Sequence, residues 1–444
     1  MAKINPFCGL LYNPEKVKDP GSVMAPPYDC ISDEMQEQLY QLNPYNVIRL
    51  IFGKIAESDS ETDNRYTRAA STFREWQQER ILVQDPKPAI YLYDQKFFTE
   101  DGKEVVRQGF LALAKLEEFC TGLIKPHEET LEGPKTDRFK LMKACKANFC
   151  SIFSLYSDPC CALESLLKKN RERTPDLLVK NSDLAEEHSL WRVTDTAQIS
   201  KAQELLSGKP IFIADGHHRY ETALMYRDYL REQNPDYTGK ELFNYVLMFF
   251  CNMEDQGLMI FPIHRLVSGL PDFDFQQFLD AVRVNFRVET DHFDAGDPVA
   301  CKRVRSSLFQ KGKHSFACYS GKGKIYFFSL KNSEIIDKVF PEEISKVVKV
   351  LDVSILHRLI FRNIFKMTDD DQKQQKYLKY LKSFDAALQA VDAGQAQLAF
   401  LMNPTRVTEV REVANLGEKM PQKSTYFYPK LLSGMVFNKI LEDS

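Results

Sequence analysis

Short apolar runs alternate with amphipathic stretches along most of the chain. The apolar run 211–214 is followed by the turn pair Asp215–Gly216, and an apolar helix face begins near Ala223. This pattern predicts a buried strand, a sharp turn and a helix, with a preceding helix over 195–206. Strand and helix patterns alternate in this way through roughly the first 270 residues, which predicts a mixed α/β fold.

Other segments show equally clear patterns. The apolar run 47–51 predicts a buried strand that contains one charge, Arg49. Residues 89–116 predict a β-hairpin with its turn at Asp101–Gly102. The polar run that begins at residue 369 predicts a helix reaching residue 391. The sequence pattern changes near residues 268–271, which predicts two domains, 1–268 and 269–444. We expect the C-terminal segment of the second domain to return to the functional site of the first.

Composition narrows the function classes. The chain has 444 residues, a formal net charge of −3 and 43% hydrophobic residues, which is typical of an ordinary globular protein. No strong positive field is present, so we expect no nucleic-acid partner. No apolar run approaches the roughly 18 residues of a membrane span, and the scattered cysteines lack metal-site spacing, so we expect a cytoplasmic protein without a membrane partner. The oligomeric state stays open.

The turn after residue 214 carries the most informative chemistry. The first amides of a helix have no intrahelical acceptor, and the helix dipole favours an anion there. Gly216 allows a close approach of the backbone, while His217, His218 and Arg219 bring titratable or cationic side chains to a position that normally favours acids. The pattern therefore predicts a phosphate site.

Two other interpretations of this turn stay open. His218 or His217 lies three or four residues before Glu221, a spacing at which a histidine and a carboxylate on one helix face can bind a metal ion together. The turn is equally compatible with a structural role, in which its side chains are hydrogen-bonded into a core.

Further charged clusters occur at a distance in the sequence. Tyr28 and Asp29 follow two prolines, which predicts a rigid loop. The loop around Gly133–Pro134 contains His127, Glu128, Lys135 and Arg138, and the C-terminal segment 417–430 contains Lys419 and Lys423 among aromatic positions. Such clusters suit either an anionic ligand with an apolar body or a solvated surface.

Several of these stretches resemble known families. IFIADGHHRYETAL resembles the phosphate loop of the ParB/sulfiredoxin superfamily, and APPYDCIS, NPYNVIRL, PHEETLEGPKTDR, FLMNPTRV and EKMPQKSTYFYPK together resemble the bacterial family known as domain of unknown function 1015. The first resemblance implies a ParB/sulfiredoxin-like nucleotide-binding core with a second α/β domain. Because that superfamily includes a free-serine kinase, it also implies L-serine as the acceptor.

The resulting hypothesis is a nucleotide-dependent phosphotransferase that acts on a small hydroxyl-bearing metabolite and uses ATP or ADP with Mg²⁺. Phosphoryl transfer requires positive charge around the phosphate and a carboxylate for the hydroxyl proton or the metal. A metal-assisted hydrolase and a non-catalytic nucleotide sensor are the alternatives. The expected roles are catalytic for Asp215, His218, Asp29 and Glu128; phosphate-binding for Gly216, His217, His218, Arg219, Lys135, Arg138, Lys419 and Lys423; substrate-binding for Arg49, Tyr28 and His127; and magnesium-binding for Asp215.

Overall fold

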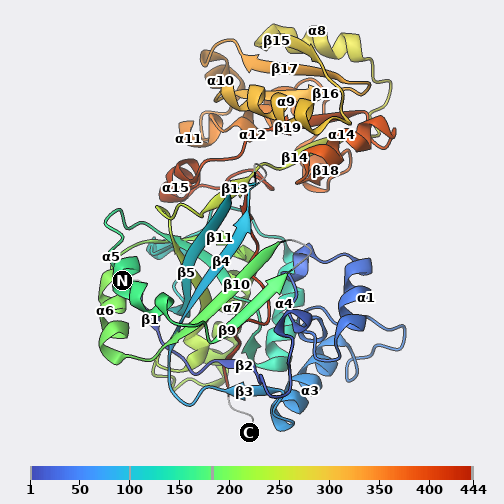
Figure 1. Cartoon of the computed structure of the whole chain (residues 1–444). Coiled ribbons are helices and arrows are strands. Elements are labelled where there is room, and N and C mark those ends of the chain that lie inside the picture. Colours follow the sequence, from blue (N-terminus) through green and yellow to red (C-terminus); the bar gives the residue numbers. More distant parts are fainter. Residues whose placement is uncertain (1–2, 100–101, 182–184, 442–444) are drawn as a thin grey trace. The chain divides into compact units, whose positions relative to one another are not determined.

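A large mixed sheet forms the centre of the first part of the chain (Figure 1). The computed structural model describes residues 3–99, 102–181 and 185–441. Within them the strand order is β6-β11-β8-β12-β5-β4-β10-β9, with β1 paired to β5. The strands are β1 (Ile4–Asn5), β4 (Ile90–Phe98), β5 (Glu104–Lys115), β6 (Ile124–Lys125), β8 (Ile152–Tyr156), β9 (Leu177–Asn181), β10 (Glu186–Val193), β11 (Ile211–Asp215) and β12 (Tyr245–Asn252).

Helices cover this sheet on the face that carries its main apolar cluster. Leu163, Ile199, Ala202, Tyr220 and Ala223 pack there against strand residues. These side chains recur at helical spacing, which explains why their segments bury one face. They belong to α5, α6 and α7, and the helices of this part of the chain are α1 (Asp33–Leu42), α2 (Ile48–Ile51), α3 (Arg65–Gln78), α4 (Glu132–Cys145), α5 (Ala162–Leu167), α6 (Thr196–Leu206) and α7 (His217–Gln233).

The chain divides into two units. Unit 1 comprises Met1–Pro126, Thr130–Met259 and Pro429–Ser444, and unit 2 comprises His127–Glu129 and Ile260–Tyr428. The division differs from the predicted boundary at residue 268, because β14 (His264–Val267) pairs with two strands of unit 2. Short pairs complete the strands: β2 (Leu10–Tyr12) with β3 (Leu82–Gln84), β7 (Ala147–Asn148) with β21 (Asn438–Lys439), and β13 (Met259–Phe261) with β20 (Tyr426–Tyr428).

Unit 2 is a sheet with an apolar cluster on each face. In the described residues its strand order is β15-β17-β16-β19-β14-β18. Its strands are β14, β15 (Phe286–His292), β16 (Ser315–Tyr319), β17 (Lys324–Leu330), β18 (Leu378–Leu381) and β19 (Leu398–Met402). One cluster contains α8 (Phe275–Asn285), α12 (Asp352–Ile355) and the π-helix Leu356–Arg362; the other contains α9 (Pro298–Gln310) and α14 (Phe384–Asp392). The remaining helices are α10 (Glu334–Val339), α11 (Lys346–Lys349), α13 (Asp369–Lys373) and α15 (Val407–Asn415).

The mixed α/β prediction is confirmed, and two local predictions change. The run 47–51 forms α2 rather than a strand, because the Asn46 side chain accepts the N–H of Ile48 and starts a helical turn. The predicted helix from residue 369 to residue 391 is interrupted by β18. The hairpin β4–β5 forms as predicted, and Asp101 of its predicted turn lies outside the described residues.

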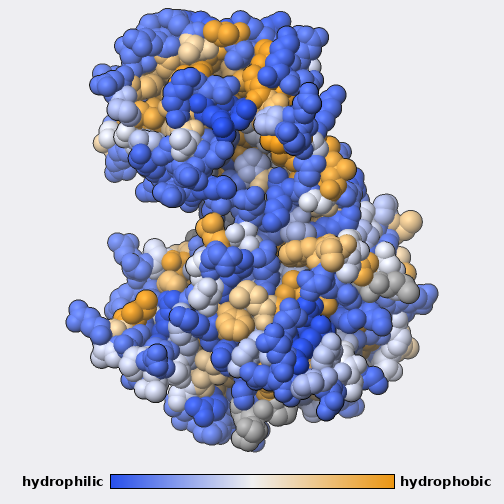
Figure 2. All heavy atoms as spheres, turned by 180° about the vertical axis from the view of Figure 1, so that it is seen from behind, coloured by the Kyte–Doolittle hydropathy of each residue, from blue (hydrophilic) through white to orange (hydrophobic). Residues whose placement is uncertain are grey.

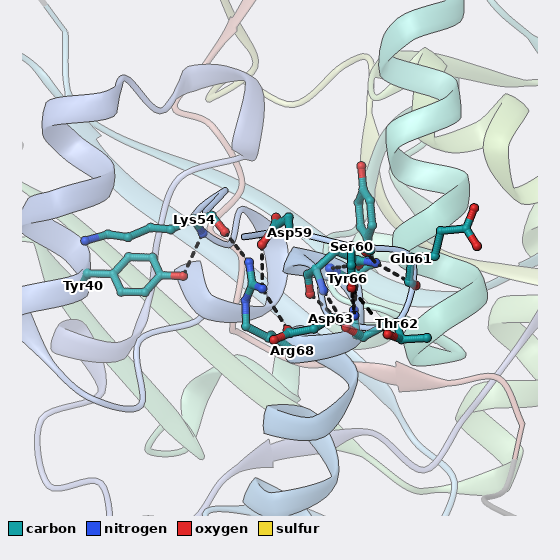
Figure 3. A network of polar contacts seen from close by, with 11 residues as sticks. Tyr40, Lys54, Asp59, Ser60, Glu61, Thr62, Asp63, Tyr66 and Arg68 are labelled. Atoms are coloured by element: carbon teal, nitrogen blue, oxygen red, sulfur yellow. Dashed lines mark hydrogen bonds and ion pairs between the residues drawn. The ribbon is translucent and has the colours of Figure 1, made fainter. Parts of the chain in front are cut away.

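The loop that leads into α3 is held by one arginine. Arg68 forms ion pairs with Asp59 at 2.8 Å and with Asp63 at 3.0 Å, and it donates to the carbonyl of Lys54 (Figure 3). Asn64 caps the helix by accepting backbone N–H groups. These polar contacts order the loop.

The face of the molecule in Figure 2 is mainly hydrophilic. Figure 2 shows apolar areas that are separated by hydrophilic residues on the face in view. No helix among the described residues has the length and apolar character needed to cross a membrane.

Candidate functional site

The turn between β11 and α7 forms as the apolar pattern predicts. The strand ends at Asp215, Gly216 adopts a left-handed conformation with φ 95°, and the helix begins at His217. No side chain caps this helix start, and its first turn contains no acid. The partial positive charge of the helix N-terminus is therefore not neutralised by an acid within that turn.

Asp215 is the centre of a charged cluster in unit 1. Its Oδ2 atom lies 3.2 Å from Nη2 of Arg219, and its Oδ1 atom lies 3.3 Å from Nζ of Lys430. Burial alone would raise the pKa of Asp215, but Lys430, Arg219 and His217 together hold it well below its usual range. The carboxylate is consequently ionised at neutral pH, and it is a weak base.

Glycine is required at position 216 for two reasons. A φ of 95° is costly for any residue with a Cβ atom. In addition, a Cβ atom built at Gly216 would lie 2.8 Å from Nε of Arg219, because this side chain folds back over the turn. Arg219 also donates to the carbonyl of Ser151, so its position is fixed from two sides.

The two histidines have different surroundings. His217 is buried at the start of the helix. His218 is half-buried, and its Nε2 atom accepts the backbone N–H of Leu131 at 2.9 Å. An accepting Nε2 requires a neutral ring with its proton on Nδ1, so His218 contributes hydrogen bonding rather than charge in this arrangement.

Lys135 lies beside α7 in a second ion-pair group. Its Nζ atom lies 3.1 Å from Glu221 and 2.7 Å from Glu132. Glu221 also accepts the hydroxyl of Thr130 at 2.6 Å. Glu132 is the main cause of a raised pKa at Lys135, so this lysine keeps its charge.

Arg138 is buried and already bonded within the protein. It donates to the carbonyl of Ile51 at 2.7 Å and to Asp137 at 2.7 Å, and its guanidinium lies 4.0 Å from the ring centre of Tyr28. Arg138, Tyr28 and Arg219 line a cavity of about 50 Å³, which suits water and is far below the size of a nucleotide site. A phosphate role for Arg138 stays a prediction, and the structure gives this residue a packing role.

Tyr28 and Asp29 lie in the short helical turn behind the two prolines. Burial raises the pKa of Tyr28 to about 12, and its hydroxyl therefore stays protonated. Asp29 is exposed, and its charge contributes to raising the pKa of Arg219 against the opposing effect of burial. Asp29 is accordingly a carboxylate close to the Asp215 cluster.

Arg49 has a local structural role. Its Nε atom donates to the carbonyl of Pro44 at 2.7 Å and its Nη2 atom to the carbonyl of Tyr40 at 2.9 Å. The guanidinium also lies 4.3 Å from the ring centre of Tyr40. These contacts hold the C-terminal end of α1, and a substrate contact by Arg49 stays a prediction.

Two distant motifs meet within unit 2. The Nε2 atom of His127 lies 3.1 Å from the hydroxyl of Thr425, and the backbone N–H of Lys423 donates to Glu128 at 3.3 Å. Lys419 lines a cavity of the same unit. The structure thus joins the motif that contains His127 and Glu128 to the C-terminal lysine segment. That His127, Glu128, Lys419 and Lys423 act with the turn of unit 1 stays a prediction.

No cluster of the described side chains supports the interpretation of the turn as a metal site. Among the residues that the structure describes, no three His, Cys, Asp or Glu side chains are arranged to hold a metal ion. Glu221 contacts Thr130 and Lys135, and Nε2 of His218 accepts from Leu131. The donors expected for a metal are therefore engaged with the protein.

Sequence reasoning missed the residues that position Lys430. The buried side chains of Gln95 and Arg107 donate to the carbonyls of Lys430 and Pro429, and the hydroxyl of Tyr93 accepts the N–H of Leu432. The sequence contained one sign of these contacts: Gln95 and Arg107 occupy inward positions of the predicted hairpin, and buried polar side chains require partners.

Comparisons with known proteins give one family. The sequence matches the model of the family described as "Protein of unknown function (DUF1015)" over residues 4–354. No curated protein matches the chain. Solved structures with some likeness include a free serine kinase in complex with AMP, at 12% identity and a TM-score of 0.33 over 69% of this chain and 83% of that chain. SbnI with a C-terminal truncation from Staphylococcus aureus has 10% identity and a TM-score of 0.33, over 73% and 85% of the two chains.

A conserved hypothetical protein from Pyrococcus furiosus has 13% identity and a TM-score of 0.32, over 69% of this chain and 87% of that chain. Likeness at these TM-scores establishes no shared activity. The site must therefore be interpreted from its own residues.

The contact of Gly216 with Arg219 can be distinguished from the strain that any side chain causes at a positive φ. Gly208 has a similar φ of 83°, and a Cβ atom there would meet no described atom within 4 Å. We expect Gly208→Ala to cost about 1 kcal/mol of unfolding free energy, and Gly216→Ala about 3 kcal/mol because Arg219 must also move away from Asp215. Urea denaturation at pH 7 measures both. Equal costs would show that Arg219 is not held against the turn.

Proposed function

The chain belongs to this family of proteins of unknown function, and we propose that it binds a nucleoside diphosphate or triphosphate at the turn Asp215–Arg219 and transfers phosphate to a small hydroxyl-bearing metabolite. The observation that carries the proposal is the convergence of Arg219 and Lys430 on Asp215 at the start of α7. Two cations, one carboxylate and a helix N-terminus leave a net positive site, which suits phosphate.

Arg219 has donors left for a ligand. A guanidinium has five N–H groups, and the contacts to Asp215 and Ser151 use two of them. Arginine binds phosphate oxygens through a planar pair of donors, and such charge-assisted bonds are stronger than neutral ones. An arriving phosphate would therefore compete with Asp215 for a side chain that already has the correct position.

The two carboxylates of this region suit different roles. Asp215 has a pKa well below its usual range, mainly because Lys430 and Arg219 outweigh the effect of burial, and a carboxylate of this kind accepts protons poorly. It is suited to hold charge, and Mg²⁺, which proteins usually bind through one or two carboxylates together with the substrate phosphates, would have to displace Arg219 or Lys430 from its oxygens. Bound Mg²⁺ would neutralise phosphate charge. Asp29 is exposed and is the better candidate to accept the hydroxyl proton.

L-Serine is the acceptor that the family resemblance implies. A free amino acid carries a carboxylate and an ammonium group, so its site needs a cation and an anion side by side. Lys135 and Glu221 form such a pair at 3.1 Å, and Glu221 belongs to the second turn of α7. We assign this pair to acceptor binding, in place of Arg49 and Arg138, whose donors contact backbone carbonyls and Asp137.

A non-catalytic nucleotide sensor is the second candidate. The observation that favours it is that both oxygens of Asp215 already contact cations, which lowers its pKa and makes the central carboxylate a poor general base. A sensor would use the same phosphate contacts and show no turnover. The two candidates therefore share their binding residues and differ in the need for Asp29.

Nucleotide binding should depend on Arg219 specifically. We expect Arg219→Gln to weaken ADP binding by about tenfold or more, since a charge-assisted hydrogen bond contributes about 1.5 to 3 kcal/mol. Arg227→Gln is the matched control, because Arg227 is also buried in α7 and paired with acids, Glu118 and Asp228. Calorimetric titration with ADP and Mg²⁺ measures both variants.

Equal weakening in the two variants would assign the effect to helix stability rather than to phosphate contact. An unchanged affinity in folded Arg219→Gln protein would remove the turn as the main phosphate site.

Turnover should yield O-phosphoserine from L-serine with ATP or ADP and Mg²⁺, detected by phosphorus NMR. Asp29→Asn should lower the rate by about two orders of magnitude, in the range of general-base catalysis, and leave nucleotide affinity within a few fold. Asp33→Asn is the control, because Asp33 is an exposed carboxylate at the start of the neighbouring helix α1.

Nucleotide binding without product would exclude serine and favour the sensor. Full activity in Asp29→Asn protein would exclude this carboxylate from the reaction.

A further inference from the structure

Unit 2 contains a cavity that the proposed function does not use. Its volume is about 420 Å³, within the range of small-molecule sites. All of its lining residues belong to unit 2. They are Glu129, Phe340, Pro341, Ile344, Val348, Ser354, His357, Arg358, Arg362, Asp369, Gln372, Lys373, Tyr380, Lys419, Met420, Pro421 and Gln422.

A π-helix forms one wall of this cavity. The segment Leu356–Arg362 is π-helical, and the N–H groups of Asn363 and Phe365 donate to carbonyls five residues earlier, at 3.2 Å and 2.9 Å. π-helical turns are rare and occur frequently at functional sites. Here the turn brings His357, Arg358 and Arg362 to the same cavity.

Two buried polar atoms at the cavity have no partner in the described part of the protein. They are the hydroxyl oxygen of Ser354 and Nε2 of His357, and the His357 ring has in addition a side-chain hydrogen bond with Gln372. Ser354 is 4% exposed, so water at the outer surface does not reach it readily. An unsatisfied buried polar group costs about 1 to 3 kcal/mol, and such groups in native structures commonly bind a ligand or an ordered water.

His357 is neutral at physiological pH. Burial is the largest cause that lowers its pKa, to about 3, and the charge of Arg265 acts in the same direction. A neutral imidazole offers either a donor or an acceptor at Nε2, depending on the tautomer. The ring therefore suits a hydrogen bond to a ligand and does not repel cations at the cavity.

Cationic side chains outnumber acids around the cavity. Arg362 is paired with Asp369 at 2.6 Å, and Arg358 donates to the carbonyl of Val339 at 2.7 Å. Lys373 and Lys419 are exposed. With Glu129 included, four cations face two carboxylates, so the lining has an excess of positive charge.

The remaining walls are apolar or aromatic. Phe340, Pro341, Ile344, Val348, Tyr380 and Met420 contribute them. Sites for small organic molecules combine apolar walls with a few polar groups that fix the orientation of the ligand. The polar groups available here are the Ser354 hydroxyl, the His357 ring and the cations.

We propose that this cavity binds a small organic anion with an aromatic or apolar body, whose phosphate or carboxylate group contacts Lys373, Lys419 and the arginines and whose body lies against the apolar walls. Ser354 and His357 hydrogen-bond a polar atom of the bound molecule. All of the lining residues belong to unit 2, and none of them is a residue of the nucleotide turn.

The test uses the full chain and three probes that share one aromatic body: 1-naphthyl phosphate, 1-naphthoate and 1-naphthol. Calorimetric titration should give saturable binding of one anion per chain, with 1-naphthol at least tenfold weaker. The stronger of the two anions then identifies phosphate or carboxylate as the preferred group. Equal binding of 1-naphthol, or binding of neither anion, would overturn the proposal.

Variants locate the probe. The double variant Lys373→Ala/Lys419→Ala should weaken the preferred anion by about tenfold, whereas Lys302→Ala, which removes an exposed lysine of α9 outside the cavity, should not change it. Arg219→Gln should also leave the affinity unchanged, and a loss in that variant would place the probe at the turn of unit 1 and overturn the proposal. An unchanged affinity of the double variant for the preferred anion would also overturn the proposal.

Ser354→Ala separates a ligand contact from a structural role. Because the hydroxyl has no described partner, its removal should leave the Tm of the free protein unchanged or higher. The same change should weaken the preferred anion severalfold. A large fall in Tm would show that the hydroxyl has a structural partner and would contradict its assigned role.

Discussion

Electrostatic balance around one carboxylate determines the arrangement of the proposed nucleotide site. Asp215 ends a buried strand, and its two oxygens contact Arg219 of α7 and Lys430 of the C-terminal segment. Removing charges from water costs several kcal/mol for each ion unless they are paired, so each of these groups requires the others. The contacts of Gln95 and Arg107 with the carbonyls of residues 429 and 430 hold the C-terminal segment where its lysine reaches the carboxylate.

The same balance determines what a ligand must do. A bound phosphate would pair with Arg219 and Lys430 partly in place of Asp215. The affinity for the nucleotide would therefore depend on how much stronger the new ion pairs are than the ones that they replace. Gly216 leaves the space over the turn to the guanidinium of Arg219. The replacement of Asp215 by phosphate at this guanidinium is therefore sterically possible. Lys135 and Glu221 extend the charged surface along α7, which brings a candidate acceptor site to the same helix.

Local patterns in the sequence predicted the strand, turn and helix around Gly216, because apolar periodicity and glycine conformation act over a few residues. The run 47–51 was wrongly predicted as a strand, since short apolar runs fit either a buried strand or a buried helical turn. The partners of Arg138 and the contact of Lys430 with Asp215 depend on tertiary packing, which periodicity does not report. The π-helix and its cavity in unit 2 were missed for the same reason.

The proposed function requires that the amides and side chains of the turn contact nucleotide phosphate. Hydrogen–deuterium exchange followed by mass spectrometry, with and without ADP and Mg²⁺, detects this contact, because bound phosphate protects the amides that it contacts. We expect slower exchange in peptides that cover Asp215–Arg219 and Lys430 when the nucleotide is present. Unchanged exchange in these peptides at a saturating nucleotide concentration, with protection at other segments, would contradict the account.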